Sequence, residues 1–306
     1  MAKLLIFRFE IEPEVFGAIL KAETNGIAEA SEYSIQLLRQ HWYLYVFEAA
    51  ELAIFMISAC LFTIFLFDPS YPALRLIPNA VTRRLLMGVA MGITAIFIIH
   101  TPMGKRSGAH FNPAITLTYL RLGKITKTDA IFYLLFQFIG GVAGVAFAKA
   151  VLPGSLADPS VRYAVTVPGQ YGTAAAFLAE IFMAILLMGA VLWTSNRPSV
   201  ARFTSYLVGI LIVFYILLFA PVSGFSINPA RTTGSAAFAH VWTEVWVYFT
   251  APVIGMMVAA EIYLRRYGAN RILCAKLHRD PKYPCPFLCH YPSHRHTLDS
   301  VAEDEI

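Results

Sequence analysis

The chain has 306 residues and a formal net charge of +5; 58% of its residues are hydrophobic and only 14% are charged. Soluble domains usually carry about 25% charged residues, so this composition excludes an ordinary soluble protein. The basic residues are spread over several short segments, which excludes a concentrated nucleic-acid-binding surface.

The first 42 residues are mixed and charged, and they lack the apolar core of a cleavable signal peptide. We expect residues 1–42 to form a cytoplasmic N-terminal arm. Two interpretations fit it: amphipathic helices on the membrane surface, around 13–20 and 27–38, or a disordered arm. The first membrane span would then serve as its own insertion signal.

Six apolar segments follow, each near the roughly 20 residues that a helix needs to cross a bilayer. They predict an all-α membrane protein with the lipid bilayer as a partner. With both termini cytoplasmic, most of the 24 lysines and arginines fall on the inner side, as the positive-inside rule requires. We expect a multi-pass protein of the plasma or inner membrane. The predicted spans are 43–67, 85–101, 129–151, 173–195, 203–221 and 243–265.

Two polar stretches interrupt this pattern, and both read S-G-x-x-x-N-P-A. The first, SGAHFNPA, begins at Ser107 between spans two and three; the second, SGFSINPA, begins at Ser223 between spans five and six. Each half of the chain, about 43–151 and 173–265, therefore has three spans. An odd number of spans gives the halves opposite orientations, so the sequence predicts an inverted repeat.

Each Asn-Pro-Ala predicts the start of a short helix, because Asn is a favoured N-cap and Pro a favoured first residue. The helices, about 113–120 and 229–238, are too short to cross a bilayer. We predict two re-entrant half-helices that enter from opposite faces and meet near the midplane. The residues of this central site are Asn112, Pro113, Ala114, Asn228, Pro229 and Ala230.

The two helix N-termini would place partial positive charge at the centre of a pore, which repels cations and protons. The asparagine amides can donate hydrogen bonds to a passing oxygen, and the extended backbone before each half-helix can accept them. Exposed backbone of this kind is tolerated only along a water-filled cavity. The candidate pore-lining carbonyls are those of Gly108, Ala109, His110, Gly224, Phe225 and Ser226.

Three further polar residues are interpreted as anchors of these loops. Glu48 and Glu180 lie inside predicted spans, where a carboxylate is costly unless it meets hydrogen-bond donors, and loop N–H groups are candidate donors. For Glu48 a position at the water interface stays open. His110 has no second His or acid at helical spacing, so we favour loop anchoring over catalysis or metal binding.

Residues 42–266 resemble the aquaporins, the major intrinsic protein family. The motifs SGAHFNPAITL and INPAR carry the resemblance, together with Glu48 and Glu180 in spans one and four. Small residues at helix contacts add to it: Gly140, Gly141, Gly144 and Gly255. The resemblance implies an aquaporin-like channel domain over 43–266, a homotetramer with one pore per subunit, and no cofactor.

The resemblance also implies a selectivity filter made of Met91, Ile216, Phe225 and Arg231, with Gly92 as the alternative to Met91. Strict water filters have His where Ile216 stands and Phe where Met91 stands, so this filter is less polar. Other residues favour water: glycerol-conducting relatives usually have Asp in place of Thr232, and they tend to lose the aromatic pair that is kept here at 248–249.

The pattern predicts a passive channel for water and other small uncharged solutes, which excludes protons and ions. The alternative is a facilitator mainly for glycerol, ammonia, hydrogen peroxide or similar neutral solutes. A secondary transporter is a distant alternative, because it usually needs more spans and carboxylates at the midplane. An enzyme is not expected, since the spans show no paired nucleophile and base.

The remaining segment, 267–306, is expected to be a cytoplasmic tail rich in Cys and His. Cys285, Cys289 and His290 are candidate metal ligands, with Cys274 or His278 as possible additions. Palmitoylation and a solvated basic tail are the other interpretations. A cytoplasmic location disfavours disulfides.

Overall fold

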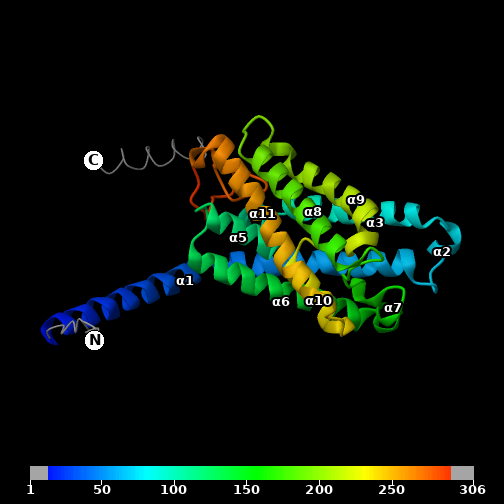
Figure 1. Ribbon diagram of the computed structural model, residues 1–306, viewed down its shortest axis with the longest axis horizontal. Coiled ribbons are helices and arrows are strands. Elements are labelled where there is room, and N and C mark those ends of the chain that lie inside the picture. Colours follow the sequence, from blue (N-terminus) through cyan, green and yellow to red (C-terminus); the bar gives the residue numbers. More distant parts are fainter. Residues whose placement is uncertain (1–12, 291–306) are drawn as a thin grey trace, which may run out of the picture. The chain divides into compact units, whose positions relative to one another are not determined.

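The computed structural model describes residues 13–290, and the regular secondary structure within that range is helical (Figure 1). The chain divides into two units, 1–42 and 43–306, each described here by itself. Helix α1, Pro13–Phe67, runs without a break through the end of the first unit. The expectation of helix around 13–20 and 27–38 is confirmed and the alternative of disorder is wrong for these residues, but both segments belong to one continuous helix, whose residues 14–67 include no proline to end it.

The structure confirms the prediction of six helices long and apolar enough to cross a membrane. The first is the part of α1 from Ser34 to Phe67. The other five are α3 (Ala80–His100), α6 (Lys127–Val151), α8 (Gly172–Ser195), α9 (Thr204–Ser223) and α11 (Val245–Tyr267). Short helical turns lie between them: α2 (Ala73–Leu76), α4 (Pro102–Ser107), α7 (Pro153–Ala157), and 3-10 turns at Arg162–Ala164 and Ala201–Phe203. A further 3-10 turn, Ala269–Arg271, follows α11.

Helix α3 begins five residues before the predicted start at 85. Asn79 caps it, since its Oδ1 accepts hydrogen bonds from the N–H groups of Val81 and Thr82 at 2.8 and 3.1 Å. Such a cap satisfies N–H groups that the first turn leaves unpaired. The charges of Arg83 and Arg84 therefore lie within the first turn or two of the helix, and the apolar run alone placed the boundary too late.

The two half-helices begin at the predicted prolines: α5 is Pro113–Arg121 and α10 is Pro229–Ala239. The cap prediction is confirmed as well. Asn112 Oδ1 accepts from the Ala114 N–H at 2.9 Å, and Asn228 Oδ1 accepts from the Ala230 N–H at 3.1 Å. With 9 and 11 residues, neither helix is long enough to cross a bilayer.

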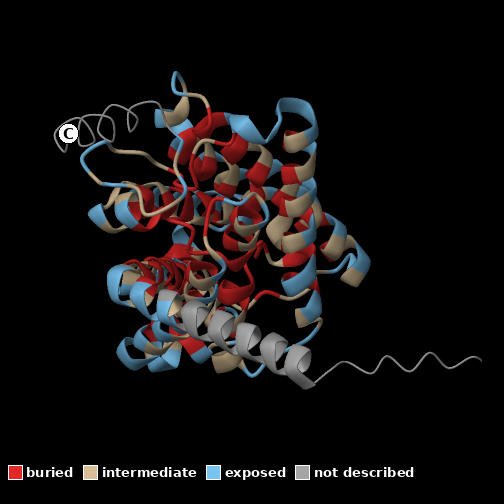
Figure 2. Cartoon of the chain, turned by 90° about the vertical axis from the view of Figure 1, so that its left-hand side faces the viewer, coloured by how far each residue is buried: buried red, intermediate tan, exposed pale blue. Residues whose placement is uncertain are grey.

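Close helix packing positions α10. The helices pair as α3 with α9, α8 with α11, and α6 with α10. At the α6–α10 contact, a Cβ added to Gly234 would lie 2.4 Å from the Gly141 carbonyl oxygen, so only glycine fits there. Figure 2 shows the buried residues gathered between the helices, while large apolar side chains such as Phe97, Ile131 and Leu178 are exposed on outer faces, as a lipid-facing surface requires.

We expect Gly234→Ala to destabilise the fold by about 1–3 kcal/mol, because the added methyl group meets backbone that cannot move aside. Gly189→Ala is the matched control, since a Cβ there meets nothing within 4 Å and helix propensity favours alanine by about 1 kcal/mol. Thermal unfolding in detergent would show a lower midpoint for Gly234→Ala and an unchanged or higher one for Gly189→Ala. Equal shifts would contradict the close contact.

Candidate functional site

The two re-entrant loops share an unusual backbone conformation. Three residues in each loop have positive φ, including two in each loop that are not glycine. Such conformations cost about 1–3 kcal/mol each unless the surroundings hold them. The matched residues, 116 positions apart, are Gly108 (98°) and Gly224 (76°), Ala109 (56°) and Phe225 (53°), and Phe111 (29°) and Ile227 (46°). The two loops therefore match each other in backbone conformation at each of these three positions.

A buried carboxylate holds each loop in this conformation. Glu48 accepts hydrogen bonds from the N–H groups of His110 and Phe111 at 2.9 and 2.6 Å. Glu180 accepts from the N–H groups of Ser226, at 2.9 Å, and Ile227. Both side chains are fully buried, so the alternative of a water-interface position for Glu48 is wrong. Carboxylates here satisfy loop N–H groups that have no other partner.

Sequence reasoning missed a second buried acid in the first half, Glu51. Ser107 Oγ donates to Glu51 Oε1 at 2.7 Å, whereas its counterpart Ser223 Oγ donates to Glu180 itself at 2.8 Å. In the first half, two carboxylates, Glu48 and Glu51, accept the hydrogen bonds that Glu180 alone accepts in the second half. The spacing of three residues between Glu48 and Glu51 places both acids on one face of α1, a signal that was readable in the sequence.

The half-helices meet through their asparagines. Asn112 Nδ2 donates to the Ile227 carbonyl and Asn228 Nδ2 donates to the Phe111 carbonyl, both at 2.8 Å. A side-chain amide has two N–H donors, so each asparagine keeps one beyond this cross-link. Both line a cavity of about 40 Å³, with apolar walls that include Ile115. That space is enough for a water molecule or two.

A larger cavity of about 350 Å³ contains the four predicted filter residues, Met91, Ile216, Phe225 and Arg231. The structure thus brings together residues from α3, α9, the second loop and α10. The alternative residue, Gly92, faces α9 instead: a Cβ there would lie 2.6 Å from the Gly209 carbonyl oxygen.

The guanidinium of Arg231 lies at the wall of this cavity and includes a donor nitrogen without a partner among the described residues. Its Nη1 is buried and has no hydrogen-bond partner within residues 13–290. Its backbone N–H is satisfied separately by Asn228 Oδ1 at 3.2 Å. Arg231 and Arg84 both line the larger cavity, whose wall is otherwise mainly apolar.

The nominated carbonyl-bearing residues do not all line the same space. His110, Phe225 and Ser226 line the small cavity, and Phe225 and Gly224 line the large one. Ala109 is fully buried. The Gly108 carbonyl accepts a hydrogen bond from the Leu277 N–H at 3.1 Å, so the C-terminal tail occupies it.

The tail segment 272–290 packs over the first re-entrant loop, at the end of the channel that we call the tail-side entrance (residues 105–110). The interpretation of a solvated tail is wrong for this part, since Cys274, Ala275, Lys276 and Leu277 are at most 3% exposed. Lys276 Nζ donates to the Lys105 carbonyl at 2.7 Å, and Leu277 lines the small cavity beside the asparagines. Residues 291–306 lie outside the described range.

His110 joins the loop to the tail. Its Nε2 lies 2.9 Å from the Ala275 carbonyl oxygen, which can only accept, so Nε2 carries the proton. Nδ1, 3.1 Å from Thr116 Oγ1, is then the acceptor. The ring is stacked between Tyr119 and Phe287, with centroid distances of 5.1 and 5.6 Å.

Ionic and aromatic contacts also hold the tail at residues 278 and 280. Lys105 Nζ and Asp280 Oδ2 are 3.0 Å apart, and this hydrogen-bonded lysine holds the pKa of Asp280 below its usual range. His278 packs against His100, with ring centroids 4.5 Å apart. Burial, helped by the nearby His100 and Lys105, lowers the pKa of His278 to about 4, so it is neutral at neutral pH.

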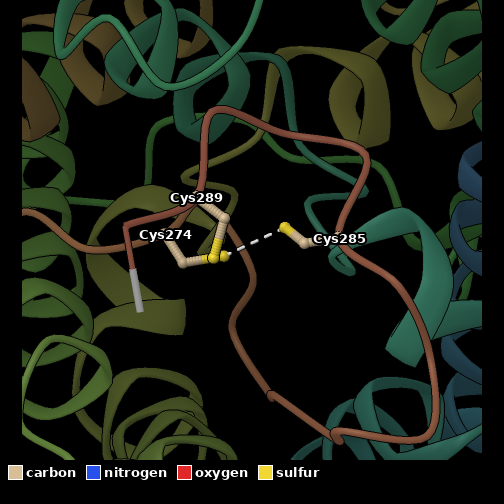
Figure 3. A group of neighbouring side chains, drawn as sticks. All are labelled: Cys274, Cys285 and Cys289. Carbon is tan, nitrogen blue, oxygen red and sulfur yellow. Dashed lines mark hydrogen bonds between the residues drawn. The ribbon is translucent and has the colours of Figure 1, made fainter. Parts of the chain in front are cut away.

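The candidate metal ligands are only partly brought together. Cys285 and Cys289 lie with Cys274, and the three sulfur atoms are all within 4.8 Å of one another (Figure 3). His290 is outside this group, and its Nδ1 lies 3.1 Å from Lys124 Nζ. His278 is not part of the group either.

Half-helices that meet inside a six-span inverted repeat define a membrane channel of the re-entrant type. The family profile described as Major intrinsic protein matches residues 45–263, and the chain belongs to this family. It is 28% identical to aquaporin Z of Rhodopseudomonas palustris over 58% of this chain and 78% of the relative. It is 33% identical to glycerol uptake facilitator protein-like 6 of Lactiplantibacillus plantarum, over 58% of this chain and 82% of the relative.

The fold has a solved counterpart in the aquaglyceroporin from Plasmodium falciparum. The TM-score is 0.63 at 18% sequence identity, over 73% of this chain and 95% of that one. This likeness confirms the predicted all-α fold with six spanning helices and two half-helices.

We expect Glu180→Gln to destabilise the protein by about 1–3 kcal/mol, because the amide NH₂ must face one of the three donors that the carboxylate now accepts. Glu261→Gln is the control: Glu261 forms a partly exposed pair with Arg121, of a kind that contributes about 0–1 kcal/mol. Thermal unfolding of both variants checks the difference. If Glu180→Gln unfolded at the same temperature as the control, the Glu180 carboxylate would not be needed to hold the second re-entrant loop.

Proposed function

We propose that this protein is a passive channel for water and small uncharged solutes, which excludes protons and ions. The observation that carries the proposal is the central site, where Asn112 and Asn228 cap facing half-helices and line a cavity of one or two waters. Names of the relatives, an aquaporin and a glycerol uptake facilitator, support the same class of solute.

The chemistry of passage follows from donors and acceptors along the path. A solute oxygen accepts first from the guanidinium of Arg231, which lines the large cavity, and then from the remaining amide N–H groups of Asn112 and Asn228. Both half-helices present N-termini, whose partial positive charge repels cations and protons. A neutral solute that accepts hydrogen bonds is not repelled, so the site discriminates by charge.

Solute size depends on the outer cavity, where Met91, Ile216 and Phe225 give carbon surface on a wall that also includes Arg231 and Arg84. That observation favours a second candidate, a facilitator for glycerol or similarly sized neutral solutes. Thr232, which stands where an Asp is usual in glycerol-conducting relatives, faces Thr166 with 2.9 Å between hydroxyl oxygens and also contacts Ser226. The hydroxyl of Thr232 is therefore used inside the loop, and Thr232 is not among the described residues that line the larger cavity.

We further propose a homotetramer with both termini cytoplasmic in a plasma or inner membrane. The placement of the basic residues supports the orientation, which makes the tail-side entrance cytoplasmic. The proposed organisation is an N-terminal arm (1–42), a channel domain (43–266) and a tail (267–306).

Stopped-flow light scattering on proteoliposomes tests the channel. We expect osmotic shrinkage in sucrose faster than for empty liposomes, and faster still for Leu277→Ala, which shortens the tail side chain that lines the small cavity. Glycerol steps then show whether re-entry follows. Shrinkage at the empty-liposome rate for both proteins would contradict a water channel.

We expect Ile216→His to lower glycerol re-entry relative to water flux, because imidazole reaches further from the backbone than isoleucine and replaces carbon surface of the 350 Å³ cavity with a hydrogen-bonding group. Ile210→His, an exposed position on the same helix, is the matched control. The ratio of glycerol to water permeability is the measured quantity. An unchanged ratio for Ile216→His would remove this residue from the filter.

A further inference from the structure

We propose that Cys274, Cys285 and Cys289 bind a thiophilic metal ion, zinc in the first instance, and that the bound ion holds the tail across the tail-side entrance and closes the channel. This regulation rests on the proposed channel function. The metal site itself stands on geometry that is independent of any solute.

The three cysteines are already gathered as ligands. Their sulfur atoms lie within 4.8 Å of one another, and those of Cys274 and Cys285 are 3.3 Å apart. Tetrahedral zinc at about 2.3 Å from each sulfur needs sulfur atoms about 3.8 Å apart. Figure 3 shows the three side chains turned toward one point from separate parts of the tail. Small side-chain adjustments therefore suffice to enclose an ion.

The surrounding charges suit a thiolate site. Three thiolates and one divalent ion carry a net charge of −1, and the ammonium groups of Lys124 and Lys276 both interact electrostatically with the cysteine sulfurs. Binding breaks three S–H bonds, releases three protons to solvent and forms three metal–sulfur bonds. The fourth coordination position is left for water or another small ligand.

The position of the ligands in the chain links the site to the channel. Leu277, which lines the small cavity and donates its N–H to the Gly108 carbonyl, lies between Cys274 and Cys285. Phe287, which stacks on His110 with its ring plane only 4° away, lies between Cys285 and Cys289. An ion that joins the three cysteines therefore closes two loops, and each loop holds one of the tail residues, Leu277 or Phe287, that contact the first re-entrant loop.

Closing loops by cross-linking reduces the freedom of the open tail and so favours the closed position. Any ligand that binds the closed arrangement better than the open one shifts the population toward it. With coupling of the usual size, about 5–150-fold, metal loading should lower water permeability by about tenfold.

The experiment has two separate readouts on the full-length protein. The first is metal content: after incubation with zinc and desalting, we expect one zinc per chain, and with cobalt a thiolate-to-metal absorption band. Cys60→Ser, which alters the cysteine buried in α1, should retain both signals. The triple variant Cys274→Ser, Cys285→Ser, Cys289→Ser should lose both. Wild type without bound metal, or with a Cys274–Cys285 disulfide instead, would overturn the site.

The second readout is water permeability of zinc-loaded and chelator-treated wild type in proteoliposomes. We expect faster flux after chelation, and high flux regardless of zinc in the triple variant. Leu277→Ala should bind zinc normally yet lose most of the zinc-dependent closure. Bound zinc with equal flux in both wild-type states would overturn the closure. Flux at the empty-liposome rate in every protein would instead overturn the channel function, and the closure with it, while the metal content still decides the site.

Discussion

The structure depends on buried carboxylates that accept hydrogen bonds from loop N–H groups. A re-entrant loop places backbone at membrane depth, where no solvent satisfies its polar groups. Glu48 and Glu180 meet the N–H groups at positions 110–111 and 226–227, all beside residues in left-handed conformations. With the N–H groups bound inward, the carbonyl groups are available to the channel or to the tail. The path for solute is thus a consequence of where two acids lie in α1 and α8.

Much of this arrangement could be predicted, because it depends on local chemistry that repeats. The proline that follows Asn112 and Asn228 predicts that each asparagine is a helix cap, and both half-helices begin at that proline. The six spans follow from apolar length. Their ends were less certain: α3 starts at a cap, Asn79, that lies outside the apolar run.

Other features depended on contacts between distant parts of the chain. The buried tail is such a case, since its basic composition predicts solvation, while Lys276 is satisfied by the carbonyl groups of Lys105 and Pro284. No pattern in the sequence of residues 267–290 predicts these hydrogen bonds. The grouping of Cys274 with Cys285 and Cys289 likewise depends on the tail folding back on itself. In the N-terminal arm the sequence indicated helix at 13–20 and 27–38 but not its continuity into the first span, which depends on the absence of any residue that breaks the helix.

The repeat also explains why the two ends of the channel differ. Arg231 corresponds to Ile115, 116 positions earlier, so only the second half-helix carries a cation in its first turn, and that residue lines the large cavity. His110 corresponds to Ser226; each bonds the threonine six residues on, but only the histidine has a further nitrogen that reaches Ala275 in the tail. These two differences give the two ends different chemistry: a cation beside the large cavity at the Arg231 end and attachment of the tail at the other. Because the anchors Glu48 and Glu180 are matched, each end can vary without loss of the fold that positions both.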